Sequence, residues 1–145
     1  MTTSLQTTPR TLVDLLRTRA ARQPDRQAYV FLDSHGAEES ALTYAELDRH
    51  ARRVAVALRT HCAPGDRVLI LRPPGTAYLT AFFGCLYAGT VAVPSYPPHA
   101  RNAARLRAIV ADAAPAAVLA GDRAAATARQ HLAELQGIPW LTDEG

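Results

Sequence analysis

Residues 66–98 read DRVLILRPPGTAYLTAFFGCLYAGTVAVPSYPP, and this stretch decides the fold. Residues 68–71 form an unbroken apolar run, which is typical of a strand covered on both faces, as in a parallel sheet. Residues 77–88 carry no charge and predict a helix that is buried all round. We expect this helix to end at Gly89, because glycine readily adopts the left-handed conformation of a helix cap.

A second buried strand is predicted at residues 91–93, ended by Pro94 because proline cannot donate a ladder hydrogen bond. With the preceding strand and helix it predicts one right-handed crossover unit. The alternation continues with a helix, a strand, an alanine-rich helix and a last strand, over residues 103–113, 117–120, 124–135 and 138–141. We expect Asn102 to cap the first of these helices. The chain is therefore predicted to be an α/β protein with a largely parallel sheet flanked by helices.

The N-terminal third predicts a short hairpin between two amphipathic helices. Residues 1–9 have the polar composition of a flexible tail. Strands are predicted at residues 28–32 and 41–43, which would pair as the hairpin. Two helix starts are indicated by a threonine with an acidic residue three positions later, at Thr11 with Asp14 and at Thr43 with Glu46.

Composition excludes several classes of function. The chain of 145 residues is long enough for one domain. Its net charge of +3 does not indicate nucleic-acid binding, because the arginines are spread along helical faces rather than gathered in a block. All 16 basic residues are arginine, so neither a phosphate-loop lysine nor a Schiff-base lysine is present. The N-terminus lacks the apolar centre of a signal peptide and no segment predicts a membrane span, so we expect a cytoplasmic protein.

Local chemistry alone indicates no active site. The glycines make no Gly-x-Gly fingerprint, and the histidines and cysteines show no metal-ligand spacing. Cys62 and Cys85 are predicted to be core thiols. The turn at residues 73–76 has one glycine and one hydroxyl, which favours a structural turn over a phosphate cradle. The Ser95 hydroxyl and the His99 ring could face a ligand, although a rigid, proline-held exit from the sheet would explain these residues equally well.

Several motifs together resemble the start of the adenylate-forming ligases. Their order and spacing carry the resemblance: LTYAEL at 42–47, PGDRV at 64–68 and FGCLYAGTVAVP at 83–94. Three further segments resemble the fatty acyl-AMP ligase branch more than acyl-CoA synthetases or amino-acid-activating domains; they are VPSYPP at 93–98, RLRAIVADA at 105–113 and PAAVL at 115–119.

This resemblance implies a protein that activates a fatty acid with ATP and Mg²⁺ and transfers the acyl group to an acyl carrier protein in polyketide or lipopeptide assembly. Within that family the phosphate loop and the catalytic lysine lie further along, and they match no position here. The resemblance therefore implies that residues 10–145 are an incomplete N-terminal large domain, without the C-terminal domain. It carries over no catalytic, cofactor or metal residue, and Tyr96, Pro97 and Pro98 are the candidate substrate-binding residues because they match the exit motif.

Two other hypotheses stay open. The chain could be a non-enzymatic module that binds an acyl chain or a carrier protein, or one subunit of a split ligase. We expect the chain alone to be inactive in adenylation and to bind no cofactor. An interrupted sheet would also expose apolar surface, which predicts self-association.

Overall fold

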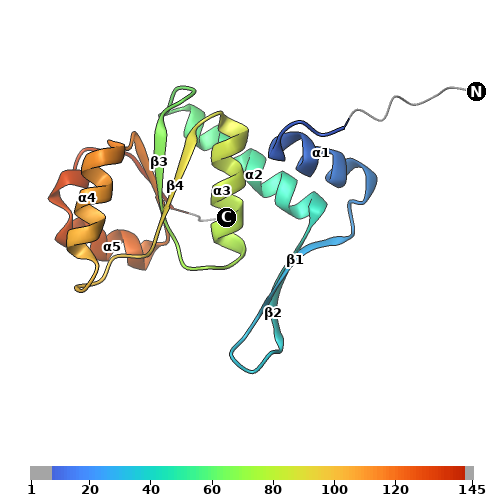
Figure 1. Cartoon of the computed structure of the whole chain (residues 1–145), viewed down its shortest axis with the longest axis horizontal. Coiled ribbons are helices and arrows are strands. Elements are labelled where there is room, and N and C mark those ends of the chain that lie inside the picture. The colour runs from blue at the N-terminus through green and yellow to red at the C-terminus, as the bar shows by residue number, and fades with distance from the viewer. Residues whose placement is uncertain (1–7, 143–145) are drawn as a thin grey trace, which may run out of the picture.

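The computed structural model describes residues 8–142, so most of the predicted tail at 1–9 lies outside the described residues. Its central feature is a four-stranded parallel sheet in the order β4-β3-β5-β6 (Figure 1). The strands are β3 (Arg67–Leu71), β4 (Val91–Ser95), β5 (Ala117–Ala120) and β6 (Trp140–Thr142). Strand β3 is central because it pairs with β4 on one side and with β5 on the other. The predicted α/β class with a largely parallel sheet is confirmed.

Helices cover both faces of this sheet, and the alternation of side chains along β3 shows how. Val68 and Ile70 pack against α2 (Tyr44–Arg59) and α3 (Thr76–Ala88). Leu69 and Leu71 point to the other face, where α4 (Ala103–Ala113) and α5 (Asp122–His131) cover them. All four side chains are fully buried, which explains why this strand is an unbroken apolar run.

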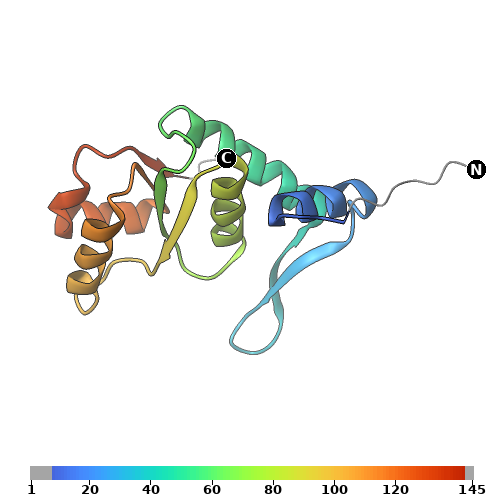
Figure 2. The ribbon, with the colours of Figure 1, turned by 45° about the horizontal axis from the view of Figure 1, so that its top comes forward.

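The N-terminal helix and hairpin form a separate layer beside α2 and α3. Helix α1 (Leu12–Arg22) precedes β1 (Gln27–Leu32) and β2 (Glu38–Thr43), which pair in antiparallel fashion as predicted. A third apolar cluster joins them to the helices, through Leu16, Leu42, Leu47, Ala51 and Phe83. Beyond this cluster the hairpin projects away from the rest of the chain (Figures 1 and 2).

Predicted helix ends and starts are confirmed at three places. The Thr11 hydroxyl accepts a hydrogen bond from the Asp14 backbone N–H at 3.0 Å. Thr43 and Glu46 form a reciprocal capping box at the start of α2. Gly89 ends α3 with a left-handed φ of 79°.

Strand β4 differs from the predicted buried strand at residues 91–93. It extends to Ser95, and Pro94 lies within it, opposite Ile70 of β3. It is also an edge strand, and Val91 is 48% exposed. Proline is tolerated here because one side of an edge strand has no ladder bonds to form.

The end of the described chain also differs from the prediction. Helix α5 ends at His131, and a short 3-10 turn, η1 (Ala133–Leu135), replaces the rest of the predicted helix. Leu132 leaves the helical conformation, and both Leu132 and Leu135 are then buried against the sheet. The last strand begins at Trp140 rather than at residue 138, because Pro139 can accept a bond from Val118 but has no N–H to donate.

None of the helices within residues 8–142 combines the length and hydrophobicity that crossing a bilayer requires.

Candidate functional site

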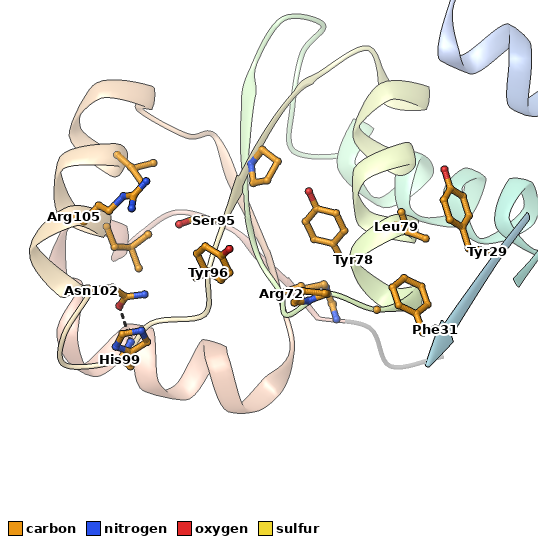
Figure 3. Close-up of a pocket in the computed structure, with 15 residues that line it drawn as sticks. Tyr29, Phe31, Arg72, Tyr78, Leu79, Ser95, Tyr96, His99, Asn102 and Arg105 are labelled. Carbon is orange, nitrogen blue, oxygen red and sulfur yellow. Dashed lines mark hydrogen bonds between the residues drawn. The ribbon is translucent and has the colours of Figure 1, made fainter. Parts of the chain in front are cut away.

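A pocket of about 640 Å³ opens at the carboxyl ends of β3 and β4. Helix α4 and the loop before it form one side, and α3 with β1 of the hairpin forms the other (Figure 3). Its volume lies in the range of small-molecule binding sites. Parallel sheets place their ligands at this edge, so position and size together make the pocket the candidate site.

Apolar and aromatic side chains supply most of the pocket wall. Tyr78 and Leu79 come from the first turn of α3, where the proline-rich turn after β3 starts the helix. Leu106 and Ile109 come from α4, and the remaining apolar and aromatic contributors are Tyr29, Phe31, Pro74, Pro94 and Tyr96. Such a wall suits an apolar ligand or the apolar part of an amphipathic one.

The polar side chains of the pocket are basic or neutral. They are Arg72, Ser95, His99, Asn102 and Arg105, and among the described residues no Asp or Glu lines the pocket. Figure 3 shows that Ser95, His99, Asn102 and Arg105 lie towards α4, whereas Tyr29, Phe31, Tyr78 and Leu79 lie towards α3 and the hairpin. The polar side chains other than Arg72 therefore gather on the α4 side, beside Leu106 and Ile109, whereas the labelled side chains towards α3 and the hairpin are aromatic or aliphatic.

Arg72 occupies the point where the order of strands reverses. The connection after β3 leads to β4 at one edge of the sheet, and the connection after β5 leads in the opposite direction, to β6. The carboxyl ends of β3 and β5 therefore form the switch point of the sheet. Arg72 is only 7% exposed, and its Nη2 donates to the Ala120 carbonyl at the end of β5 at 3.0 Å. Its side chain therefore links the ends of β3 and β5, and it also lines the pocket.

The loop after β4 is shaped by Asn102, which does not cap α4 as predicted. Its side-chain amide instead accepts from the His99 backbone N–H at 2.8 Å and donates to the Pro97 carbonyl at 3.1 Å. Both bonds lie within the loop, so the side chain is committed there rather than to the helix N–H groups. They place His99 at the pocket.

The candidate residues from the exit motif fall in different environments. Tyr96 lines the pocket and is 70% exposed. Pro98 is buried, and neither it nor Pro97 belongs to the described pocket wall. Pro74 and Gly75 line the pocket, so the turn at 73–76 contributes to its wall. A role of Tyr96, Pro97 or Pro98 in substrate binding stays a prediction.

Several pocket residues were missed in the sequence, including Tyr29, Tyr78, Arg72 and Arg105. The rule that ligands bind at carboxyl ends of parallel strands would have indicated Arg72, which directly follows the apolar run. No local signal marks Tyr29, because the hairpin reaches the pocket only through tertiary packing.

Both cysteines are free; Cys85 is buried in the core as predicted, whereas Cys62 is only partly buried against it. Burial raises the pKa of the Cys85 thiol to about 12. The Cys62 pKa is also raised, by burial and by the nearby Asp66 carboxylate. Neither thiol is ionised near neutral pH, so neither is an activated nucleophile. Within residues 8–142, no group of three His, Cys, Asp or Glu is placed to hold a metal ion.

The family model of AMP-binding enzymes matches residues 16–142. The chain belongs to this family. Its relatives include the medium-chain fatty acid–[acyl-carrier-protein] ligase JamA of Moorena producens, 37% identical over 92% of this chain and 24% of that protein.

Solved structures of the AMP-binding family agree with this assignment. The fatty acid AMP ligase of Legionella pneumophila superposes with a TM-score of 0.75 and 34% identity, over 91% of this chain and 23% of that one. A fatty acyl-adenylate ligase of L. pneumophila, in complex with acyl adenylate and pyrophosphate, gives a TM-score of 0.73 and 36% identity over the same shares. The resemblance to a part of a fatty acyl-AMP ligase is confirmed, and the chain spans about a quarter of the length of these relatives.

Proposed function

We propose that this chain is the part of a ligase that receives the acyl group of a fatty acid for activation by ATP. In the proposed reaction a carboxylate oxygen attacks the α-phosphorus of ATP, pyrophosphate leaves, and an acyl-adenylate forms. The thiolate of a carrier protein's phosphopantetheine then attacks the acyl carbonyl, and AMP leaves. The observation that carries the proposal is the largely apolar, basic pocket at the carboxyl edge of the sheet, in a chain whose relatives are named for fatty acid activation.

The chain's own residues do not fit ATP or Mg²⁺. The sequence has no lysine and no glycine-rich phosphate loop. The acidic side chains of residues 8–142 form no cluster that would suit Mg²⁺. The proposal therefore assigns ATP, Mg²⁺ and the adenylation chemistry to residues outside this chain, with residues 10–145 contributing a part of the large N-terminal domain. Free thiols are typical of a reducing compartment, so the proposal places the ligase in the cytoplasm.

A chimaera tests the proposal. The chain would replace the matching quarter of the Moorena producens ligase, and decanoate-dependent exchange of pyrophosphate into ATP would be measured. We expect exchange by the chimaera, and none by the 145-residue chain alone. A folded chimaera without exchange would contradict the assignment to fatty acid activation. Exchange by the chain alone would contradict the assignment of ATP binding and adenylation to residues outside this chain.

A non-enzymatic acyl-binding module is the second candidate, because the pocket is already formed within the described residues. Saturable binding of decanoate by the chain together with an inactive chimaera would favour this module over the ligase. A split ligase would instead gain activity when the chain is mixed with the remainder of a ligase as a separate polypeptide.

A further inference from the structure

The polar side chains of the pocket, apart from Arg72, lie on its α4 side, beside Leu106 and Ile109. The side towards α4 holds Ser95, His99 and Arg105, and the side towards α3 and the hairpin holds Phe31, Tyr78 and Leu79 (Figure 3). A ligand with one charged end and one apolar end meets the exposed arginine of the pocket only when its charged end lies on the α4 side. The reverse direction would place the anionic group among Phe31, Tyr78 and Leu79, away from that arginine.

Two arginines line the pocket, and Arg105 is the one placed to meet the charged end, because Arg72 is only 7% exposed and already donates to the Ala120 carbonyl. The Arg105 guanidinium makes no hydrogen bond or ion pair to any other residue in the part of the chain that the structure describes. It is exposed, so it can bind an anion without first breaking an internal contact. Its neighbour on α4, Arg107, is different, because it donates to the His131 carbonyl at 3.2 Å and lies 3.8 Å from Glu134.

We propose that the pocket binds an alkyl chain that ends in an anionic oxygen group, with this group at Arg105 and the chain running towards Tyr78, Leu79 and Phe31. Carboxylate and phosphate share this chemistry, since both accept paired N–H bonds from a guanidinium. This inference rests on the proposed function. It adds the direction in which the ligand lies and the residue that binds its anionic end. Arg105 thereby determines specificity for an anionic over a neutral amphiphile.

Ligand binding to the unmodified chain is the first test. Dodecanoate, dodecyl phosphate and dodecanol would be titrated below their critical micelle concentrations, with affinity measured by calorimetry. We expect both anions to bind about fivefold more tightly than the alcohol, as a solvent-exposed ion pair of about 1 kcal/mol predicts. The tighter of the two anions identifies the head group. Equal affinity for all three ligands would overturn the proposal.

Two matched variants of α4 test which arginine recognises the charge of the ligand. Arg105→Gln should bring dodecanoate affinity down to that of dodecanol, whereas Arg107→Gln removes the same charge from the same helix and should keep the difference. Equal losses in both variants would show a general field effect and would overturn the assignment to Arg105. Dodecanol affinity should be unchanged in both, which separates loss of the charge contact from loss of the pocket.

Photo-crosslinking tests the direction. Dodecanoate with a diazirine at its methyl end should label peptides that contain Phe31 or residues 78–79. Labels confined to residues 95–109 would overturn the proposed direction. These outcomes are independent of the exchange assay, because an active chimaera with no preference for anions in the isolated chain refutes the inference and leaves the proposed function in place.

Discussion

Gly84 lies in the contact between α2 and α3, where a side chain has no room. A Cβ atom built at this position would lie 2.4 Å from Val54 Cγ1 and 2.5 Å from Val54 Cβ. The Cβ atom of Val54 cannot move by rotation of its side chain, so the helices themselves would have to separate. Close approach at this residue is therefore a condition of the α2–α3 packing.

Gly84→Ala is expected to destabilise the chain by about 1–3 kcal/mol, which is the usual cost of overpacking a core. The sign is informative, because an alanine in a helix would otherwise gain about 1 kcal/mol over glycine. Urea unfolding followed by circular dichroism measures the difference. In Gly84→Ala/Val54→Gly both Val54 atoms of the overlap, Cβ and Cγ1, are removed, so the double variant should lose less than the sum of the single variants. A stabilised Gly84→Ala would contradict the close contact.

Asp48 of α2 accepts two hydrogen bonds, one from α3 and one from its own helix. Its carboxylate accepts from the Tyr87 hydroxyl at 2.6 Å and from Arg52 Nε at 2.8 Å. Burial on its own raises the pKa of Asp48, but the bonds from Arg52 and Tyr87 and the charge of Arg52 outweigh it and leave the pKa below its usual value. The folded state therefore favours the ionised carboxylate.

This lowered pKa predicts a pH dependence of stability. A carboxyl group with a lowered folded-state pKa contributes stability above its unfolded pKa of about 3.9, and the contribution is lost as pH falls through the folded value. Asp48→Asn should thus be less stable than the unmodified chain at pH 7, by about 1–2 kcal/mol. The difference should shrink towards pH 3, as measured by urea unfolding at both pH values. Asp112→Asn, at an exposed position on α4, is the control and should show a much smaller difference at either pH. A difference for Asp48→Asn that is the same at both pH values would argue against the role of the carboxylate charge.

At the scale of elements, the start of α2 depends on its capping box. The Thr43 hydroxyl accepts from the Glu46 backbone N–H at 3.2 Å, and Glu46 accepts from the Thr43 N–H at 2.9 Å. Thr43→Ala should cost about 1 kcal/mol, because N–H groups of the first turn lose their acceptor. Thr43→Ser keeps the hydroxyl and should cost much less. Thermal unfolding of the two variants decides, and equal losses would assign the effect to the threonine methyl group instead.

The elements that could be predicted from the sequence are those with a local cause. The run at residues 68–71 is apolar because it is covered on both faces, and α3 ends at Gly89 because the chain turns left-handed there. The edge position of β4 could not be predicted, since it depends on where the chain returns to the sheet after α4. The Asn102 side chain was misassigned for a related reason, because a loop acceptor and a loop donor compete with the helix for its amide.

At the scale of the whole molecule, the pocket is assembled from segments far apart in the sequence. Residues of β1, the β3–α3 turn, β4 and α4 line it, and only tertiary packing brings them together. The carboxyl-edge rule predicts where such a site lies, but not that a projecting hairpin supplies Tyr29 and Phe31 to one side. The sequence therefore predicted the candidate residues after β4, but not the pocket wall that the hairpin and α3 form on the other side.

Exposed apolar surface on the hairpin carries the last prediction, that the isolated chain self-associates. Leu32 is 59% exposed and Val30 is 37% exposed, on a two-stranded sheet whose edges pair with no further strand among the described residues. Unpaired edges and apolar side chains together favour contact between copies. We expect concentration-dependent association in sedimentation and enhanced fluorescence of a hydrophobic dye.

Leu32→Glu should weaken both signals, because a charge on the hairpin opposes association of its apolar face. Val56 is 66% exposed on α2 but lies beside Arg52 and Arg53, so Val56→Glu is the matched control and should leave association nearly unchanged. Equal effects of the two substitutions would assign association to overall charge rather than to the hairpin. A monodisperse monomer that does not bind the dye would contradict the prediction and would mean that the hairpin surface is too small to hold two copies together.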